Sequence, residues 1–249
     1  MSTIPLPPFR HQHQVMTYET GQTGAMTPSA LIHLLQHTAG KHANELGWSV
    51  RGLHEAGLTW VLQRFYLEIN RLPEDDTRFT IETRPSGADR ILAYRDYRVM
   101  DEDGECLALA TSSWVVMDLE SRRPVAITDE IRELGSQFGP RYIEAPKTRQ
   151  QAFEPAPDTP IFRVRKHDLD LNGHVNNVRY IEWALESVPN ELFLSGNLRT
   201  LDITFKAECF FGDEIISAQR QADPETYEHT LLKASDQKVV SLLRTTWDK

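Results

Sequence analysis

Cysteine is scarce in this sequence, and so are long apolar runs. Cys106 and Cys209 are the two cysteines among 249 residues, far apart and without the spacing of metal ligands. They do not make the disulfide framework that stabilises small secreted proteins. No stretch approaches the roughly 20 apolar residues of a transmembrane helix, and residues 1–15 lack the apolar core of a signal peptide. We therefore expect a protein of the reducing cytoplasm that does not insert into membranes.

Positive charge is also in short supply. The 27 Lys and Arg residues are outnumbered by 36 Asp and Glu residues, which leaves a formal net charge of −9. Nucleic-acid backbones require a basic protein face, so this balance argues against nucleic-acid binding. The content of 40% hydrophobic and 25% charged residues is that of an ordinary globular protein, and the length suffices for a full core.

What the sequence does contain is one pattern that occurs twice. Residues 27–47 predict a helix, with Thr27 as N-cap, Pro28 in the first turn and Gly47 at the end. Its apolar face would consist of Leu31, Leu34, Leu35, Thr38 and Leu46. Strands are expected at 60–69, 77–85, 91–101 and 105–118, with a hairpin turn at 101–104.

The second half of the chain repeats this order. A helix is expected over 177–188, stopped by Pro189, with Val178, Ile181, Leu185 and Val188 facing inward. Strands are expected at 198–209, 213–221, 226–235 and 238–247. The endings SSW (112–114) and TTW (245–247) also correspond. One helix followed by four antiparallel strands, present twice, predicts a duplicated α+β fold.

A single helix is buried by a small sheet only if the sheet curls round it. Two such units would pair their sheets edge to edge, since open edges invite aggregation. This is the hotdog arrangement: two tandem units, each a long helix wrapped by a curved antiparallel sheet, with the sheets paired into one continuous sheet. We expect an N-terminal unit at 1–140, a polar, Pro-rich linker at 141–160 and a C-terminal unit at 161–249.

Residues 167–177, HDLDLNGHVNN, are rich in polar side chains. Alternating oxygens followed by Gly173 look like the first half of an EF-hand calcium loop. The closing ligand of such a loop would fall on Arg179, which cannot bind a cation, so calcium is not predicted. The histidines of the first predicted helix have no Cys or acidic residue to complete a zinc site. No metal or other cofactor is expected.

The run DLNGHVNNVRY, from Asp170 to Tyr180, resembles the signature of hotdog thioesterases. The longer segment 168–189, together with TFKAECFFGDEI (204–215), resembles the acyl-ACP thioesterases of plants and bacteria. The resemblance covers nearly the whole chain in layout and is specific in these two segments. It implies hydrolysis of acyl-carrier-protein thioesters to free fatty acid and carrier, ending fatty acid synthesis, with acyl carrier protein as the partner.

The family pattern carries over onto Asp170, Asn172, His174 and Glu208. Thioester hydrolysis needs an activated nucleophile, proton transfer and donors for an oxyanion. Glu208 would activate water or attack directly through an anhydride, and His174 would polarise the carbonyl or relay a proton. Asn172 would donate a hydrogen bond, and Asp170 would orient the network. In an extended segment, the first three side chains would share one side.

Three other interpretations remain open. Cys209 with His174 and Asn172 supplies the residue types of a thiol triad, although alternation along a strand would turn Cys209 away from the face of Glu208. The enzyme could instead act on acyl-CoA, or the chain could be a non-catalytic acyl-binding module. In that last case Asp170 and Asn172 would be turn residues before a helix.

The first half lacks this chemistry. Residues 17–28, TYETGQTGAMTP, contain no His and no suitably placed carboxylate, so one catalytic site per chain is expected. The first half would hold the acyl chain, using its helix and residues 60–69. Arg163, Arg165 and Lys166 are expected to contribute to a basic surface for the carrier, although alternating charge is also typical of a half-exposed strand. The sequence is compatible with a monomer or a homodimer.

Overall fold

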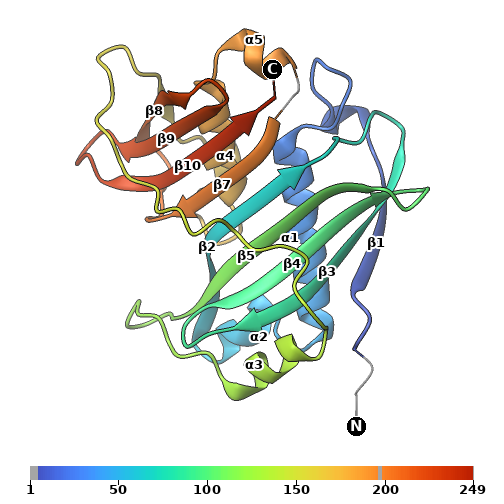
Figure 1. Cartoon of the computed structure of the whole chain (residues 1–249). Coiled ribbons are helices and arrows are strands. Elements are labelled where there is room, and N and C mark those ends of the chain that lie inside the picture. Colours follow the sequence, from blue (N-terminus) through green and yellow to red (C-terminus); the bar gives the residue numbers. More distant parts are fainter. Residues whose placement is uncertain (1–4, 196–197, 249) are drawn as a thin grey trace. The chain divides into compact units, whose positions relative to one another are not determined.

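A computed structural model describes residues 5–195 and 198–248. The chain forms two compact units, the first unit Met1–Ala145 and the second unit Pro146–Lys249. In each unit a helix packs against an antiparallel sheet, α1 in the first and α4 in the second (Figure 1). The predicted α+β fold of two helix-and-sheet units is confirmed. Among the described residues, no helix is both long and apolar enough to cross a membrane.

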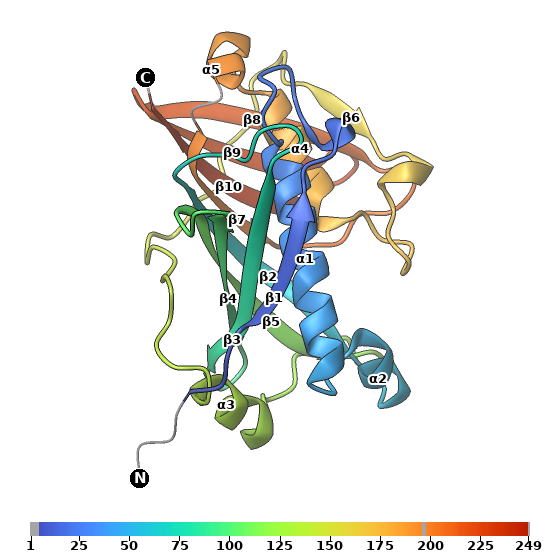
Figure 2. The ribbon, with the colours of Figure 1, turned by 90° about the vertical axis from the view of Figure 1, so that its right-hand side faces the viewer.

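The first unit consists of β1 (Phe9–Gln14), η1 (Thr17–Glu19), α1 (Pro28–Glu45), α2 (Val50–Glu55), β2 (Leu58–Ile69), β3 (Arg78–Ala88), β4 (Ala93–Asp101), β5 (Cys106–Asp118) and α3 (Asp129–Ser136). Its strands lie in the order β1-β3-β4-β5-β2, and each pair is antiparallel. The helix α1 runs alongside β1 and β3 (Figure 2).

The second unit consists of β6 (Ile161–Arg163), η2 (Lys166–Asp168), α4 (Asn177–Glu186), α5 (Asn190–Ser195), β7 (Leu198–Phe205), β8 (Glu214–Asp223), β9 (Thr226–Lys233) and β10 (Val239–Trp247). Its strands lie in the order β7-β10-β9-β8-β6. The helix α4 contacts β8, β9 and β10.

The two units share more than their element order. In the first unit, the indole Nε1 of Trp114 donates to Ser112 Oγ at 2.8 Å. In the second unit, the indole Nε1 of Trp247 donates to Thr245 Oγ1 at 3.0 Å. The matching SSW and TTW endings therefore make the same hydrogen bond, which supports the duplication predicted from the sequence.

The structure differs from the predicted plan in one regular way. Each unit has a further strand before its helix, β1 in the first and β6 in the second, so the described sheets have five strands each. The β1 sequence, FRHQHQ, contains no β-branched residue, and β6 is only three residues long. Both lie at the edge of their sheet, where strand signals are weak because one side lacks a partner.

The helix α1 begins and ends as predicted. Thr27 Oγ1 accepts the Ala30 N–H at 3.2 Å, and Gly47 adopts a φ of +81° after the last turn. The buried face is wider than predicted and also shifted, since Leu34 and Leu46 are only half-buried. The buried residues are Leu31, Ile32, Leu35, Thr38, Ala39 and His42.

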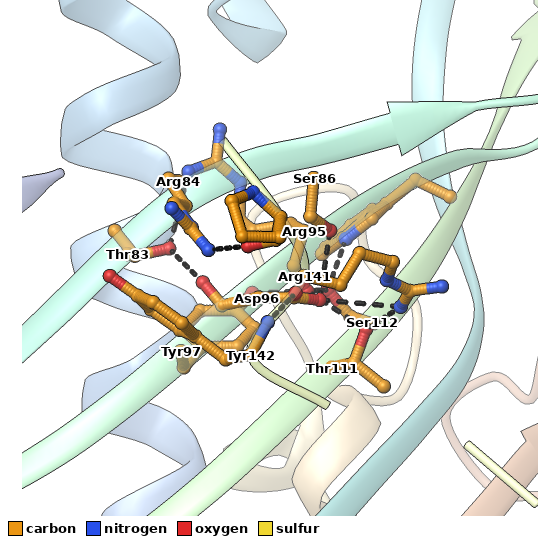
Figure 3. A network of polar contacts seen from close by, with 12 residues as sticks. Thr83, Arg84, Ser86, Arg95, Asp96, Tyr97, Thr111, Ser112, Arg141 and Tyr142 are labelled. Carbon is orange, nitrogen blue, oxygen red and sulfur yellow. Dashed lines mark hydrogen bonds and ion pairs between the residues drawn. The ribbon is translucent and has the colours of Figure 1, made fainter. Parts of the chain in front are cut away.

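A network of charged and polar groups covers the sheet of the first unit on the face opposite α1. The buried carboxylate of Asp96 accepts from Ser86 Oγ at 2.8 Å, from the Tyr142 N–H at 2.8 Å and from Arg141 at 3.3 Å (Figure 3). These contacts tie the segment after α3 to β4. Arg141 is therefore engaged within the first unit, where it also donates to Thr111 Oγ1.

Candidate active site

The loop that leads into α4 is organised by one carboxylate. Asp170 Oδ1 accepts the N–H groups of Asn172 at 2.8 Å and His174 at 3.2 Å. The Asp170 N–H in turn donates to the His174 carbonyl at 2.7 Å, and Gly173 between them has a φ of +75°. The segment is thus a tight loop and not the extended segment that we expected. Expecting extension was wrong because a short acidic side chain can close a turn on its own backbone.

Two further residues hold this loop against the helix. Asn176 Oδ1 caps α4 by accepting the Val178 N–H at 3.0 Å. The buried Asp168 carboxylate is paired with Arg165 at 3.0 Å and Arg179 at 3.6 Å. Burial alone would raise the pKa of Asp168, but the hydrogen bonds from Arg165 hold it below its usual range. Asp168 therefore remains a carboxylate that anchors the loop.

Glu208 belongs to a segment that is distant from this loop in the sequence. The strand β7 ends at Phe205, because the N–H groups of Lys206 and Ala207 both donate to the Val240 carbonyl and the chain leaves the ladder. Glu208 thus lies beyond the strand in which we expected it. The following residues still run beside the loop, since the Val175 N–H donates to the Cys209 carbonyl at 2.9 Å.

The loop and this segment bring a histidine and a carboxylate together. His174 Nδ1 lies 3.5 Å from Glu208 Oε1, and the two side chains are 28% and 33% exposed. The Phe210 ring stands edge-on to the His174 imidazole, with 5.2 Å between ring centroids. The 3.5 Å between His174 Nδ1 and Glu208 Oε1 is longer than a good hydrogen bond. Acid–base pairs often have such a long separation before a substrate binds. A water molecule can reach both groups, so the pair is suited to proton transfer.

Asp170 and Asn172 differ from this pair in what surrounds them. Asp170 uses its carboxylate on the backbone of the loop, which fits the predicted orienting role. Asn172 is exposed. The catalytic roles of Asp170, Asn172, His174 and Glu208 stay predictions.

Cys209 is placed differently from its neighbour Glu208. Its side chain is fully buried, and burial raises the pKa of the thiol. A cysteine nucleophile reacts as the thiolate, which such surroundings disfavour. The Cys209 N–H donates to Tyr180 Oη at 3.1 Å, and its carbonyl accepts from Val175. The backbone groups of Cys209 therefore help to hold the site together. The geometry gives the thiol triad no support.

The first unit contains the same loop without the same side chains. The Gly21 N–H donates to the Ala25 carbonyl at 2.9 Å, as the Asp170 N–H does to His174, and Gly24 has a φ of +78°. The segment after β2 corresponds as well, since the Met26 N–H donates to the Pro73 carbonyl at 2.7 Å as the Val175 N–H does to Cys209. In chain order, Gly21, Thr23, Ala25 and Leu72 stand where the second unit has Asp170, Asn172, His174 and Glu208.

The first unit has a cavity of about 440 Å³ beside α1. Its lining is mostly apolar and includes Trp48, Trp60 and Trp114. We expected the first helix and residues 60–69 to line such a space, and α1 and Trp60 do so. Sequence reasoning missed the contributions of β3, β4 and α3, which depend on strand register and on helix packing. The cavity-lining residues of these three elements are Pro85, Gly87, Ala93, Tyr94, Arg95, Ile131 and Leu134.

The three basic residues before the loop are exposed. Arg165 forms an ion pair with Asp168. Arg163 lies on the edge strand β6, and Lys166 lies in the turn that follows. In the part of the chain that the structure describes, no three or more His, Cys, Asp or Glu side chains form a group that could hold a metal ion.

Comparison with known proteins gives consistent matches for both units. Residues 7–134 match the sequence profile of the acyl-ACP thioesterase N-terminal domain, and residues 155–249 match that of the C-terminal domain. The chain is 31% identical over 239 residues to the chloroplastic oleoyl-acyl carrier protein thioesterase of Coriandrum sativum, covering 89% of this chain and 64% of that protein. The chloroplastic oleoyl-acyl carrier protein thioesterase 2 of Arabidopsis thaliana is 30% identical, with 87% and 64% covered. The chain thus spans just under two thirds of the length of these relatives.

Solved structures show the same architecture. An acyl-ACP thioesterase from Bacteroides thetaiotaomicron superposes with a TM-score of 0.87 at 27% identity, covering 96% of this chain and 97% of that one. The 12:0-ACP thioesterase from Umbellularia californica superposes with a TM-score of 0.83 at 23% identity, covering 96% of each chain. The second likeness concerns the fold alone.

Proposed function

Because the chain belongs to the acyl-ACP thioesterase family, we propose that it hydrolyses acyl-carrier-protein thioesters to free fatty acid and carrier protein. The observation that carries this proposal is the pairing of His174 Nδ1 with Glu208 Oε1 at 3.5 Å, at a partly exposed position. The family signature lies in the two segments that supply this pair. Release of free fatty acid would end chain elongation in fatty acid synthesis.

In the proposed reaction, Glu208 takes a proton from water while the water oxygen attacks the thioester carbonyl carbon. His174 stabilises the negative charge on the carbonyl oxygen and passes a proton to the departing sulfur, so that the C–S bond breaks as a C–O bond replaces it. The positive end of α4 follows the loop directly and favours the same oxyanion. Direct attack by Glu208 through an anhydride is the alternative. A single turnover in oxygen-18 water tests for the anhydride: label on Glu208 would identify this route, because it enters only when water opens the anhydride at the glutamate carbonyl.

The test of the assignment is free-thiol release from an acyl-carrier-protein thioester. We expect Glu208→Gln and His174→Ala to lower kcat by at least about 100-fold while the proteins stay folded, since each removes a proton-transfer group. Glu214→Gln and His167→Ala are the matched controls, because both side chains are exposed and lie close in sequence. Turnover near the wild-type rate in both site variants would show that the chemistry lies elsewhere.

We assign the two units different tasks. The second unit carries the reaction, and the cavity of the first unit holds the acyl chain, which its mostly apolar lining supports. Gly21, Ala25 and Leu72, which stand in the corresponding positions of the first unit, have no side chain that could move a proton. One reacting site per chain follows, and both free cysteines, Cys106 and Cys209, suit a reducing compartment such as the cytoplasm.

The proposed partner is the acyl carrier protein, recognised in part by Arg163, Arg165 and Lys166. These side chains are exposed and lie just before the catalytic loop, so an acidic partner can reach them. We expect Arg163→Glu with Lys166→Glu to raise KM for a carrier-bound substrate about tenfold or more, and to leave a small thioester nearly unaffected. Equal effects on both substrates would exclude this surface. Faster turnover of the matching acyl-CoA would identify CoA as the natural carrier, and no thiol release from either would indicate an acyl-binding module.

A further inference from the structure

The cavity of the first unit contains a positive charge that the surrounding protein does not neutralise. Arg95 lies on β4 and contributes to the lining. Its neighbour Asp96 belongs to the opposite face of the strand, as successive residues do, and is bound there by Ser86 and Arg141 (Figure 3). Within the described residues, no carboxylate lies at ion-pair distance from the Arg95 guanidinium.

The partners that Arg95 does have are neutral. Its Nη1 donates to His42 Nδ1 at 3.1 Å and to Thr83 Oγ1 at 3.2 Å. Burial is the larger cause and the charge of Arg95 the smaller cause that together lower the pKa of His42 to about 4. The imidazole is therefore an uncharged acceptor at neutral pH. An arginine keeps its charge at any ordinary pH and offers five N–H donors in a planar fork. Both its charge and part of its donor set thus remain available to a ligand.

The rest of the cavity is suited to hydrocarbon. Three tryptophans, two residues of α3 and the small residues of α1 provide apolar parts of its walls. Its volume of about 440 Å³ lies within the range of small-molecule sites, roughly 300–1,000 Å³. A cation held among apolar side chains is stabilised most by an anion that also displaces water from the walls. An alkyl chain that ends in a carboxylate meets both requirements.

We infer that the cavity of the first unit binds free fatty acid, with the carboxylate paired to Arg95 and the alkyl chain among the tryptophans. The inference rests on the proposed function for the source of the ligand, since fatty acid is the product of the proposed hydrolysis. A product molecule bound in this way occupies the space assigned to the acyl chain and competes with the next substrate. The first unit then senses accumulation of product.

The test compares two ligands of equal chain length, dodecanoate and dodecan-1-ol, by calorimetry below their aggregation limits and by quenching of tryptophan fluorescence. We expect the wild-type protein to bind dodecanoate at least about tenfold more tightly than the alcohol, because a guanidinium–carboxylate pair is charge-assisted. Arg95→Met should abolish this preference, while Arg95→Lys should keep part of it. Arg71→Met is the matched control, since this exposed arginine pairs with Asp101 outside the cavity.

Equal affinity of the wild-type protein for acid and alcohol would overturn the inference, and so would an undiminished preference in folded Arg95→Met. The ligand comparison needs no variant, so it decides the matter even if Arg95→Met does not fold. Binding is measured without a thioester, which separates this inference from the proposed activity. Preference for dodecanoate in a protein that releases no thiol would leave the binding site standing and the proposed hydrolysis refuted. Turnover without a preference for dodecanoate would leave the proposed hydrolysis standing and refute the binding site.

Discussion

At the scale of residues, the two units differ more in the side chains of their loops than in the backbone of these loops. The loops before α1 and α4 make corresponding hydrogen bonds and each contains a glycine of positive φ, Gly24 or Gly173. They differ in the side chains that the loop presents. Asp170, His174 and Glu208 were predictable because the family pattern names them. Tyr180 had no predicted role, since its partners lie 27 and 29 positions away along the chain.

Tyr180 holds the backbone on both sides of Glu208. Its hydroxyl accepts the Cys209 N–H at 3.1 Å and donates to the Ala207 carbonyl at 3.5 Å. We expect Tyr180→Phe to lower kcat about tenfold with little change in KM, because Glu208 loses its fixed position while substrate contacts remain. The comparison variant is Tyr97→Phe, which removes a buried hydroxyl bonded to Ser112 in the first unit. If both variants lose stability alike and kcat is unaffected, Tyr180 is only a packing residue.

At the scale of elements, prediction succeeded where the signals are local. The helices α1 and α4 were found from their caps and periodicity, and the long strands from alternating apolar residues. The edge strands β1 and β6 and the short helices α2, α3 and α5 were missed, because too few residues carry the pattern and tertiary contacts decide their structure. The cavity was foreseen only in outline for the same reason, since α3 completes its wall through packing and not through periodicity.

The helix α3 packs on β3 at a point where only glycine fits. A Cβ on Gly135 would lie 2.6 Å from the Gly87 backbone nitrogen. We expect Gly135→Ala to lower the free energy of unfolding by about 1–3 kcal/mol, because one backbone must move away from the other. Gly40 in α1 is the matched control: a Cβ there meets nothing within 4 Å, so Gly40→Ala should raise stability by up to about 1 kcal/mol. Urea unfolding of the two variants measures both effects, and equal stability of Gly135→Ala and wild type would refute the close packing.

At the scale of the whole molecule, the two units share one architecture. Each unit keeps a helix against a five-stranded antiparallel sheet and the same indole–hydroxyl bond near its end. Each also buries a histidine between sheet and helix, His42 in the first unit and His229 in the second. These histidines were not recognisable from the sequence, because neither is part of a motif and their burial depends on packing across each unit.

Both buried histidines link the stability of the molecule to pH in the same direction. Burial lowers the pKa of His229 to about 4, and burial followed by the charge of Arg95 does the same for His42. In the unfolded chain these histidines would titrate near 6.5, so the unfolded state binds more protons between pH 6.5 and 4. Their neutral forms therefore contribute full stability above pH 6.5, and that contribution is lost as the pH falls toward 4.

We expect the free energy of unfolding to fall by up to about 1.4 kcal/mol per pH unit for each histidine across this window. His229→Leu should flatten the dependence by about that amount, because the variant has no imidazole to protonate at this position. His167→Gln is the control, since His167 is exposed and its replacement should leave the slope unchanged. Carboxylates also titrate below pH 5, so the difference between variant and wild type, measured by urea unfolding at several pH values, isolates the histidine. Parallel stability curves for His229→Leu and the wild-type protein would mean that His229 is already able to take up a proton in the folded state.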